Sequence, residues 1–167
     1  VSLIATVSRD EIAALTAPAE RVTKALPMPM IALRQGATII CPADTDVAAF
    51  FGRLGKVIEV DGSSEFDALS VATATFASYF QYLETIHKWL KDHGVADAKA
   101  RDYVTALFKA LGSAPETTSA DFKLLAAEEY ATRGGLNEQV LRELTDRGVF
   151  DAFEISLDGV HRRILAS

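Results

Sequence analysis

The sequence predicts an α/β segment over residues 1–62 followed by an all-helical segment over residues 63–167. Short apolar runs of strand type alternate with capped helices as far as Asp61, whereas apolar residues recur at helical spacing after Ser63. The composition also changes at Gly62 and Ser63, which marks the predicted domain boundary. Because this turn is short, we expect the two segments to pack together.

Two helices are expected to separate the extended runs of the first segment. Ser8 and Glu11 form a capping-box pattern that begins a helix over residues 9–15. Asp44 is the expected N-cap of a helix over residues 45–54, which is followed by glycine. The extended runs are short, rich in apolar residues and bounded by turn residues, and they cover residues 1–5, 21–26, 37–41 and 56–61.

Five helices are predicted in the second segment. The first, over residues 64–93, is apolar over too wide an arc for one partner, so part of its surface is expected to be buried in a second subunit. A homodimer formed through the helices would supply that cover. Gly112 and Pro115 are expected to end the second helix. The remaining helices are expected at about residues 97–111, 119–132, 137–148 and 151–165.

Charge and composition exclude several classes of function. The net charge is −6 with both signs interspersed, whereas a nucleic-acid surface would carry a basic stripe. The longest apolar runs, such as residues 36–41, fall far short of the roughly 20 residues that span a bilayer. We therefore expect a cytoplasmic globular protein with neither nucleic acid nor membrane as a partner.

Cysteine and histidine usage gives no sign of a disulfide or a metal site. Cys41 is the single cysteine and is expected to be a buried, inert thiol in a strand. His87 and His93 are six residues apart, so they lie on different faces of a helix and lack metal-ligand spacing. No bound metal is predicted.

The glycine-rich turn Arg133-Gly134-Gly135-Leu136-Asn137-Glu138-Gln139 is the candidate site that the residues alone single out. Paired glycines before a helix let backbone N–H groups approach an anion or carboxylate, and the positive end of the helix dipole assists. The same pattern also builds an ordinary corner between two helices, with Asn137 as the N-cap. Both interpretations remain open at this level.

A second candidate is a polar patch of Tyr79, Tyr82, Glu84 and His87, in which His87 follows Glu84 by one helical turn. Such a group can act as an acid/base site, or it can supply helix-surface polarity and dimer contacts.

The order of elements and several local strings resemble the pyrroline-5-carboxylate reductase family from Val1 to about Phe153. Residues 1–8 resemble the strand and turn that end the family's dinucleotide domain. Residues 21–38 resemble its segment with a Met-Pro-Asn-Thr-Pro motif and a later glycine, and residues 52–60 its Gly-Lys-Val strand. The helical part has two further matches, residues 67–79 with the Ser-Gly-Ser-Gly-Pro-Ala-Tyr helix and residues 132–150 with the Ser-Pro-Gly-Gly-Thr-Thr loop.

This resemblance implies the α/β end of a Rossmann-type dinucleotide domain followed by an all-α helical dimerisation domain. It also implies an oxidoreductase that uses NADP or NAD to reduce a small imine or carbonyl substrate by hydride transfer, working as a homodimer. The residues carried over from the family motifs are Pro27 and Met28 for the cofactor, Thr73, Thr75 and Asn137 for catalysis, and Gly134, Gly135, Leu136 and Asn137 for the substrate.

The sequence departs from the family pattern at several of these positions. Met28 stands where the family has asparagine, Phe76 replaces a glycine, and Leu136 and Asn137 replace the threonines that hold the substrate carboxylate. Losing several hydrogen bonds at roughly 1 kcal/mol each would weaken binding of the typical substrate by orders of magnitude. We therefore expect a different substrate.

The cofactor fingerprint, a Gly-x-Gly-x-x-Gly turn between a strand and a helix, does not occur in this sequence. The resemblance implies that it lies upstream of Val1, so the chain is expected to be the C-terminal portion of a reductase-like protein that cannot bind a whole cofactor alone. The alternative is a catalytically inactive dimerisation or binding module on the same scaffold.

Overall fold

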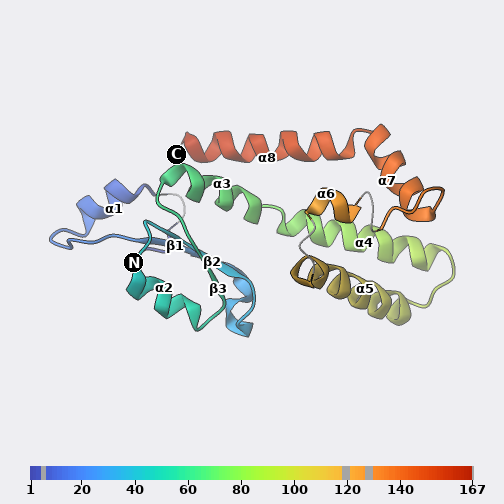
Figure 1. The fold of residues 1–167 in the computed structure, drawn as a ribbon, viewed down its shortest axis with the longest axis horizontal. Coiled ribbons are helices and arrows are strands. Elements are labelled where there is room, and N and C mark those ends of the chain that lie inside the picture. Colours follow the sequence, from blue (N-terminus) through green and yellow to red (C-terminus); the bar gives the residue numbers. More distant parts are fainter. Residues whose placement is uncertain (5–6, 118–120, 127–129, 167) are drawn as a thin grey trace. The chain divides into compact units, whose positions relative to one another are not determined.

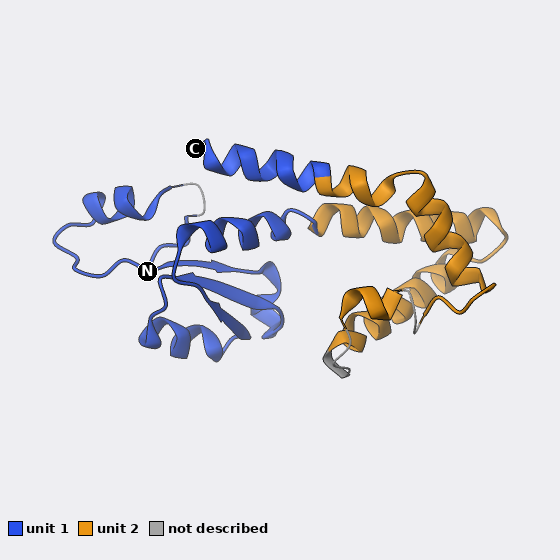
Figure 2. Ribbon diagram, turned by 45° about the horizontal axis from the view of Figure 1, so that its top comes forward, with its two compact units in different colours: residues 1–75, 155–167 blue, residues 76–154 orange. Residues whose placement is uncertain are grey.

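The computed structural model describes residues 1–4, 7–117, 121–126 and 130–166 (Figure 1). The chain divides into two compact units: unit 1 comprises residues 1–75 and 155–167, and unit 2 comprises residues 76–154 (Figure 2). The boundary expected at Gly62 and Ser63 lies at the start of α3 (Ser63–Thr73), inside unit 1.

A three-stranded sheet forms the centre of unit 1. Its strands are β1 (Lys24–Pro27), β2 (Ala37–Cys41) and β3 (Lys56–Glu59), in the order β1-β2-β3. β2 runs antiparallel to β1, with Lys24 opposite Cys41, and parallel to β3. The helix α2 (Thr45–Gly52) connects the two parallel strands, so β2, α2 and β3 form a βαβ unit.

The expected N-terminal strand at residues 1–5 is reduced to one isolated bridge in the described part of the chain. Ser2 N donates to Thr23 O (2.9 Å), and Ala25 N donates to Ser2 O (2.8 Å). Leu3 and Ile4 leave more than half of their surface exposed, so no packing extends the pairing beyond Ser2. Residue 5 lies outside the described residues.

Both predicted helix caps of unit 1 are confirmed. In α1 (Arg9–Leu15), Ser8 Oγ accepts from Glu11 N (3.2 Å) and Ser8 N donates to Glu11 Oε2 (3.1 Å), which completes the capping box. In α2, Asp44 Oδ1 accepts from Asp46 N (3.0 Å) and Val47 N (3.1 Å). These side chains fix where the two helices begin.

The core of unit 1 lies on both faces of the sheet, because neighbouring residues of β2 point to opposite sides. On one face Ala25 and Ile40 pack with Val47 and Phe51 of α2. On the other face Ile39, Cys41 and Val60 pack with Phe66 of α3. The sheet therefore lies between α2 and α3 (Figure 2). Burial of each large apolar side chain contributes roughly 1.5–3 kcal/mol to the stability of this arrangement.

The predicted burial of the single cysteine is confirmed. Cys41 is 7% exposed, and desolvation by burial raises the pKa of its thiol, an effect that the nearby charges of Arg9 and Lys24 partly offset. A raised pKa leaves little thiolate near neutral pH, which agrees with an unreactive thiol.

The prediction of one helix over residues 64–93 is wrong, because the chain breaks between α3 and α4 (Phe76–Asp92). At the break the Thr73 hydroxyl donates to Ser70 O (2.7 Å) and the Thr75 hydroxyl donates to Ala72 O (2.7 Å). Ala74 N bonds three residues back, to Val71 O (2.9 Å). Thr75 N likewise bonds to Ala72 O (3.3 Å), so the backbone bonds shift from four to three residues back and α3 ends.

The predicted end of the second helix of the helical segment is also wrong. The helix α5 (Asp97–Thr117) continues through Gly112 and Pro115. Pro115 lacks the N–H that would bond to Leu111 O and its ring crowds that carbonyl, but only two residues of α5 follow it, so the disturbance is confined to the end of the helix. The Ser113 hydroxyl donates to Ala110 O (2.8 Å) in the same turn.

The remaining elements of unit 2 are helical. α4 packs against α5, where the Phe108 ring makes edge contacts with Tyr79 (6.4 Å between centroids) and Tyr82 (5.5 Å). Of the helix expected at residues 119–132, the described residues contain α6 (Phe122–Leu124), and residues 130–132 are not helical, so the expected end at residue 132 is wrong. α7 (Leu136–Asp146) and α8 (Val149–Leu165) follow, and α8 begins in unit 2 and ends in unit 1. Among the described residues no strand occurs after residue 63, as predicted.

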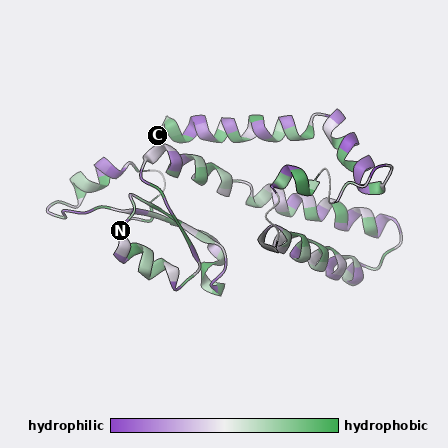
Figure 3. Ribbon diagram, in the orientation of Figure 1, coloured by the Kyte–Doolittle hydropathy of each residue, from purple (hydrophilic) through white to green (hydrophobic). Residues whose placement is uncertain are grey.

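Three of the longer helices bury their apolar residues only in part. Along their described lengths, α4, α7 and α8 contain no buried residue, although each mixes apolar and polar side chains (Figure 3). In α4, which belongs to the segment 64–93 expected to contact a second subunit, Tyr79, Phe80, Tyr82 and Trp89 are exposed in the isolated chain.

Candidate functional site

The two residues expected at the cofactor lie where β1 ends, Pro27 as its last residue and Met28 directly after it. Met28 follows Pro27 and has both main-chain groups in use, since its N donates to Ala37 O (3.1 Å) and its O accepts from Ile31 N (3.0 Å). The Met28 sulfur lies 3.4 Å from Ala37 N. The half-buried side chain therefore presents an apolar wall and no side-chain donor.

Gly36 permits this arrangement. Its φ is +84°, in the left-handed region, and a Cβ atom there would lie 3.2 Å from the Met28 sulfur and 3.3 Å from Met28 Cβ. Only glycine combines that backbone conformation with that approach.

The candidate hydroxyls Thr73 and Thr75 lie at the break between α3 and α4. Because each hydroxyl donates its proton to a carbonyl of α3, neither side chain presents that proton outward in this conformation. A ligand that needs a donor from either residue must compete with a carbonyl three residues earlier.

The candidate turn of unit 2 is built around two glycines. Gly134 has a φ of +76°, and a Cβ atom on Gly135 would lie 2.8 Å from Thr132 O, so both positions favour glycine. Gly135 N donates to Thr132 O (2.8 Å). Gly135 is the N-cap of α7, which corrects the expectation that Asn137 caps this helix.

Two further donors of this turn bond within the protein. Gly134 N donates to Glu138 Oε2 (2.5 Å), and the Asn137 side-chain amide donates to Tyr130 O (2.9 Å). Leu136, the first residue of α7, is 82% exposed. Asn137 cannot cap the helix because its side chain turns back to Tyr130, seven residues earlier.

The predicted polar patch on α4 separates into two groups. Tyr79 and Tyr82 pack their rings against Phe108, whereas Glu84 and His87 belong to a charged cluster. His87 Nδ1 lies 3.4 Å from Glu84 Oε2. The patch therefore does not gather all four side chains around one point.

The charged cluster also contains Lys91 and Asp97, which the sequence did not indicate. His87 Nε2 lies 3.4 Å from Asp97 Oδ1, within ion-pair range, although this buried nitrogen makes no hydrogen bond within the described chain. Lys91 Nζ contacts the same Asp97 oxygen at 2.7 Å. Asp97 begins α5, so the only signal in the sequence was an acidic residue at the start of the next helix. The cluster joins the end of α4 to the start of α5.

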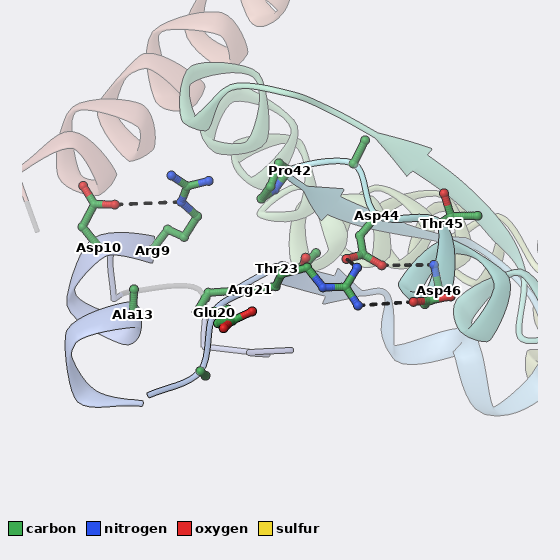
Figure 4. A pocket seen from close by; sticks show the side chains of 13 residues that line it. Arg9, Asp10, Ala13, Glu20, Arg21, Thr23, Pro42, Asp44, Thr45 and Asp46 are labelled. Carbon is green, nitrogen blue, oxygen red and sulfur yellow. Dashed lines mark hydrogen bonds and ion pairs between the residues drawn. The ribbon is translucent and has the colours of Figure 1, made fainter. Parts of the chain in front are cut away.

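A pocket of about 520 Å³ lies in unit 1, between the start of α1 and the segments 19–23 and 42–46 (Figure 4). The Arg21 guanidinium lies 3.4 Å from both Asp44 Oδ2 and Asp46 Oδ2, and Arg9 Nε lies 3.9 Å from Asp10 Oδ1. The arginines of the pocket are thus paired with its own aspartates. None of the site residues expected from the sequence lines this pocket.

The described residues contain no group of three or more histidine, cysteine, aspartate or glutamate side chains that could hold a metal ion. No described helix combines the length and the apolar character needed to cross a membrane.

No protein-family model matches the sequence, and no curated protein is significantly similar to it. Solved structures are similar in fold. Pyrroline-5-carboxylate reductase from Coxiella burnetii is 21% identical with a TM-score of 0.83, covering 99% of this chain and 64% of that one. The Streptococcus pyogenes enzyme is 17% identical with a TM-score of 0.84, covering 97% of this chain and 65% of that one.

A third structure, Plasmodium falciparum pyrroline carboxylate reductase with NADP bound, is 13% identical with a TM-score of 0.74 and covers 86% of this chain and 59% of that one. The chain spans less than two thirds of the length of each of these proteins. The expected resemblance is confirmed at the level of the fold.

Proposed function

We propose that this chain is the C-terminal portion of an NAD(P)-dependent oxidoreductase similar to pyrroline-5-carboxylate reductases. In this proposal it reduces a small imine or carbonyl substrate other than the family's typical one, in the cytoplasm. The observation that carries the proposal is the agreement in fold with such reductases over nearly the whole chain. The substituted motif residues Met28, Leu136 and Asn137 support a different substrate.

The cofactor-side residues fit one end of a nicotinamide dinucleotide. Pro27 and Met28 offer an apolar wall at the end of β1, held in place by the approach of Gly36, and a flat ring packs well against such a wall. The bound cofactor would supply the hydride. Since the sequence contains no glycine-rich pyrophosphate turn, these residues account for contacts to the nicotinamide end alone.

The substrate-side residues would position the reacting group. Thr73 and Thr75 would bind it through their hydroxyls, each giving up a bond to an α3 carbonyl at a cost of roughly 1 kcal/mol. The turn of Gly134, Gly135, Leu136 and Asn137 would form the other part of the substrate site through its backbone and the Asn137 amide.

A homodimer is part of the proposal. α4, α7 and α8 have no buried residue over their described lengths, and α4 exposes the aromatic side chains of Tyr79, Phe80 and Trp89. A second copy that covers these helices would remove this apolar surface from water.

Calorimetric titration with NADPH and NADH tests the proposal. It is made on this chain and on a version extended through the upstream coding sequence. Binding by the extended version alone supports the reductase, and imine and keto-acid substrates are then assayed with it. The absence of binding by either version would overturn the reductase proposal.

The second candidate is an inactive dimerisation or binding module. The observation that favours it is the use of the turn's donors within the protein, at Gly134 and Asn137, together with the loss of the asparagine at Met28. A chain that dimerises in sedimentation equilibrium while both versions fail to bind cofactor would support this candidate.

A further inference from the structure

The pocket of unit 1 contains a buried hydroxyl without a partner in the described chain. Thr23 is 4% exposed, and Figure 4 shows its side chain among those that line the pocket. The main chain is fixed at this position, because Thr23 O accepts from Ser2 N (2.9 Å), but no hydrogen bond joins the hydroxyl to another described residue. A buried hydroxyl that lacks a partner is unfavourable. Thr23 therefore calls for a polar occupant of the pocket.

Two carboxyl groups of the lining also have unused acceptor atoms. Arg21 lies 3.4 Å from both Asp44 Oδ2 and Asp46 Oδ2, and Asp44 Oδ1 accepts from backbone N–H groups of α2. Asp46 Oδ1 makes no hydrogen bond within the described part of the chain. The exposed Glu20 forms no ion pair with any described residue. The pocket thus presents several oxygen atoms that can accept a hydrogen bond.

The charges of the lining favour a cation over an anion. The lining contains two arginines and four acidic residues. Arg21 is already paired with Asp44 and Asp46, and Arg9 Nε lies 3.9 Å from Asp10 Oδ1. The excess of acidic groups attracts a positive charge. Because the described residues hold no group of side chains that could bind a metal ion, an organic cation fits the pocket better than a metal ion.

The size and the apolar part of the lining narrow the ligand further. The volume of about 520 Å³ lies within the range of roughly 300–1,000 Å³ that is common for small-molecule sites. Ala13, Ala19, Val22 and Pro42 line the same space and can cover methylene groups. A primary ammonium group has three donors and no acceptor, which matches a lining with unused acceptors.

We propose that this pocket binds a small aliphatic amine as its ammonium ion. Thr23 Oγ1 accepts one of the ammonium N–H groups, Glu20 and Asp46 supply the opposite charge, and Val22 and Pro42 contact the aliphatic chain. None of the residues assigned above to the cofactor or the substrate takes part, so the proposal does not depend on the reductase function.

The test is a titration of the ¹⁵N-labelled full chain with n-butylammonium chloride, at constant ionic strength set with sodium chloride, that follows the amide signals of the pocket. Sodium butyrate and n-butanol are the matched probes, because they replace the ammonium group by a carboxylate or a hydroxyl. We expect saturable shifts with n-butylammonium, and a dissociation constant at least about tenfold lower than for either other probe.

Three variants assign the binding to the named side chains. Thr23→Val removes the hydroxyl and keeps the shape, and should raise the dissociation constant for n-butylammonium at least about tenfold. Glu20→Gln removes an exposed charge and should raise it about twofold to fivefold. Glu59→Gln is the control, because Glu59 is exposed on β3 outside the pocket and should leave binding unchanged.

Butyrate or n-butanol binding as tightly as n-butylammonium would overturn the proposal, and so would the absence of saturable shifts with n-butylammonium. Unchanged binding by Thr23→Val would also overturn it. If Thr23→Val does not fold, Glu20→Gln and Glu59→Gln decide: weaker binding by Glu20→Gln alone supports the proposal, and equal binding by the two overturns it. The titration needs neither cofactor nor turnover, so its outcome is separate from the calorimetric test of the reductase.

Discussion

Lys91 and Asp97 form an ion pair in which Lys91 Nζ lies 2.7 Å from Asp97 Oδ1, and this contact joins the last turn of α4 to the first residue of α5. The hydrogen bond from Lys91 and its charge lower the pKa of Asp97. In turn, the hydrogen bond to Asp97 and the charge of Asp97 raise the pKa of Lys91. Both shifts mean that the charged forms are favoured when the two helices are together.

The stability that this pair contributes is expected to depend on pH in a definite direction. Because the folded pKa of Asp97 is lowered, its contribution is present above the unfolded value near 3.8 and is lost as the pH falls through the folded pKa. Because the folded pKa of Lys91 is raised, its contribution is present below 10.5 and is lost as the pH rises through the folded pKa.

Urea unfolding of Asp97→Asn and of the wild type between pH 3 and pH 7 measures this effect, with Asp102→Asn on the same helix as the control. The midpoint difference between wild type and Asp97→Asn should be small near neutrality, as for other exposed pairs, and should shrink further at acid pH. A difference that grows as the pH falls would contradict the assignment.

Substitution of Gly36 by alanine is expected to destabilise unit 1. The left-handed φ of +84° costs a residue with a Cβ atom roughly 1–2 kcal/mol, and the 3.2 Å approach to the Met28 sulfur adds to it. Gly52→Ala is the control, because nothing lies within 4 Å of a Cβ atom there and the residue is helical. Chemical denaturation should show a loss for Gly36→Ala and little change or a gain for Gly52→Ala.

Two neighbouring phenylalanines give a matched test of the core. Phe51 is 6% exposed and packs between α2 and the sheet, whereas Phe50 is 57% exposed, and their rings meet edge to face at 5.1 Å. Phe51→Ala should lower the free energy of unfolding by roughly 3–5 kcal/mol. Phe50→Ala should cost about 1 kcal/mol, from the loss of the ring contact. Similar losses for the two variants would contradict the burial of Phe51 between α2 and the sheet.

A charge on the uncovered face of α4 is expected to weaken the proposed homodimer. Phe80 is 64% exposed on this helix, and a buried aromatic anchor of an interface typically contributes about 2 kcal/mol or more, which corresponds to a roughly 30-fold change in the dissociation constant. Sedimentation equilibrium of Phe80→Glu measures that change. Leu33→Glu in unit 1, at a residue 71% exposed, serves as the control and should leave the dimer intact.

Signals contained within a few neighbouring residues were sufficient to predict much of unit 1. Ser8 with Glu11, and Asp44 with the N–H groups of Asp46 and Val47, cap their helices as expected, and β2 has the predicted limits, residues 37–41. In each case the side chain that decides the structure lies within four residues of the backbone that it stabilises. These features therefore needed no knowledge of the tertiary fold.

The features that were not predicted depend on a choice between competing hydrogen-bond partners, or on contacts between residues that are several positions apart in the sequence. At Thr73 and Thr75 the residues permit a helix, but the backbone N–H groups of Ala74 and Thr75 bond three residues back and the helix ends. At Pro115 a helix continues because only its last turn is affected. The Asn137 amide prefers Tyr130 O to the helix end. Spacing patterns contain no information on which of two available partners a group will choose.

The reaction rate of the buried Cys41 thiol can report how often α3 separates from the sheet. As the single cysteine, it lies between the sheet and α3 beside Phe66 and Val60, so a thiol reagent reaches it when that layer separates. With excess reagent, the labelling rate then measures how often α3 and the sheet separate locally under native conditions, and no label has to be introduced by mutation. Fluctuations of the sheet against α3 can thus be followed on the unmodified protein, amide exchange in Ile39 and Ile40 providing the independent comparison.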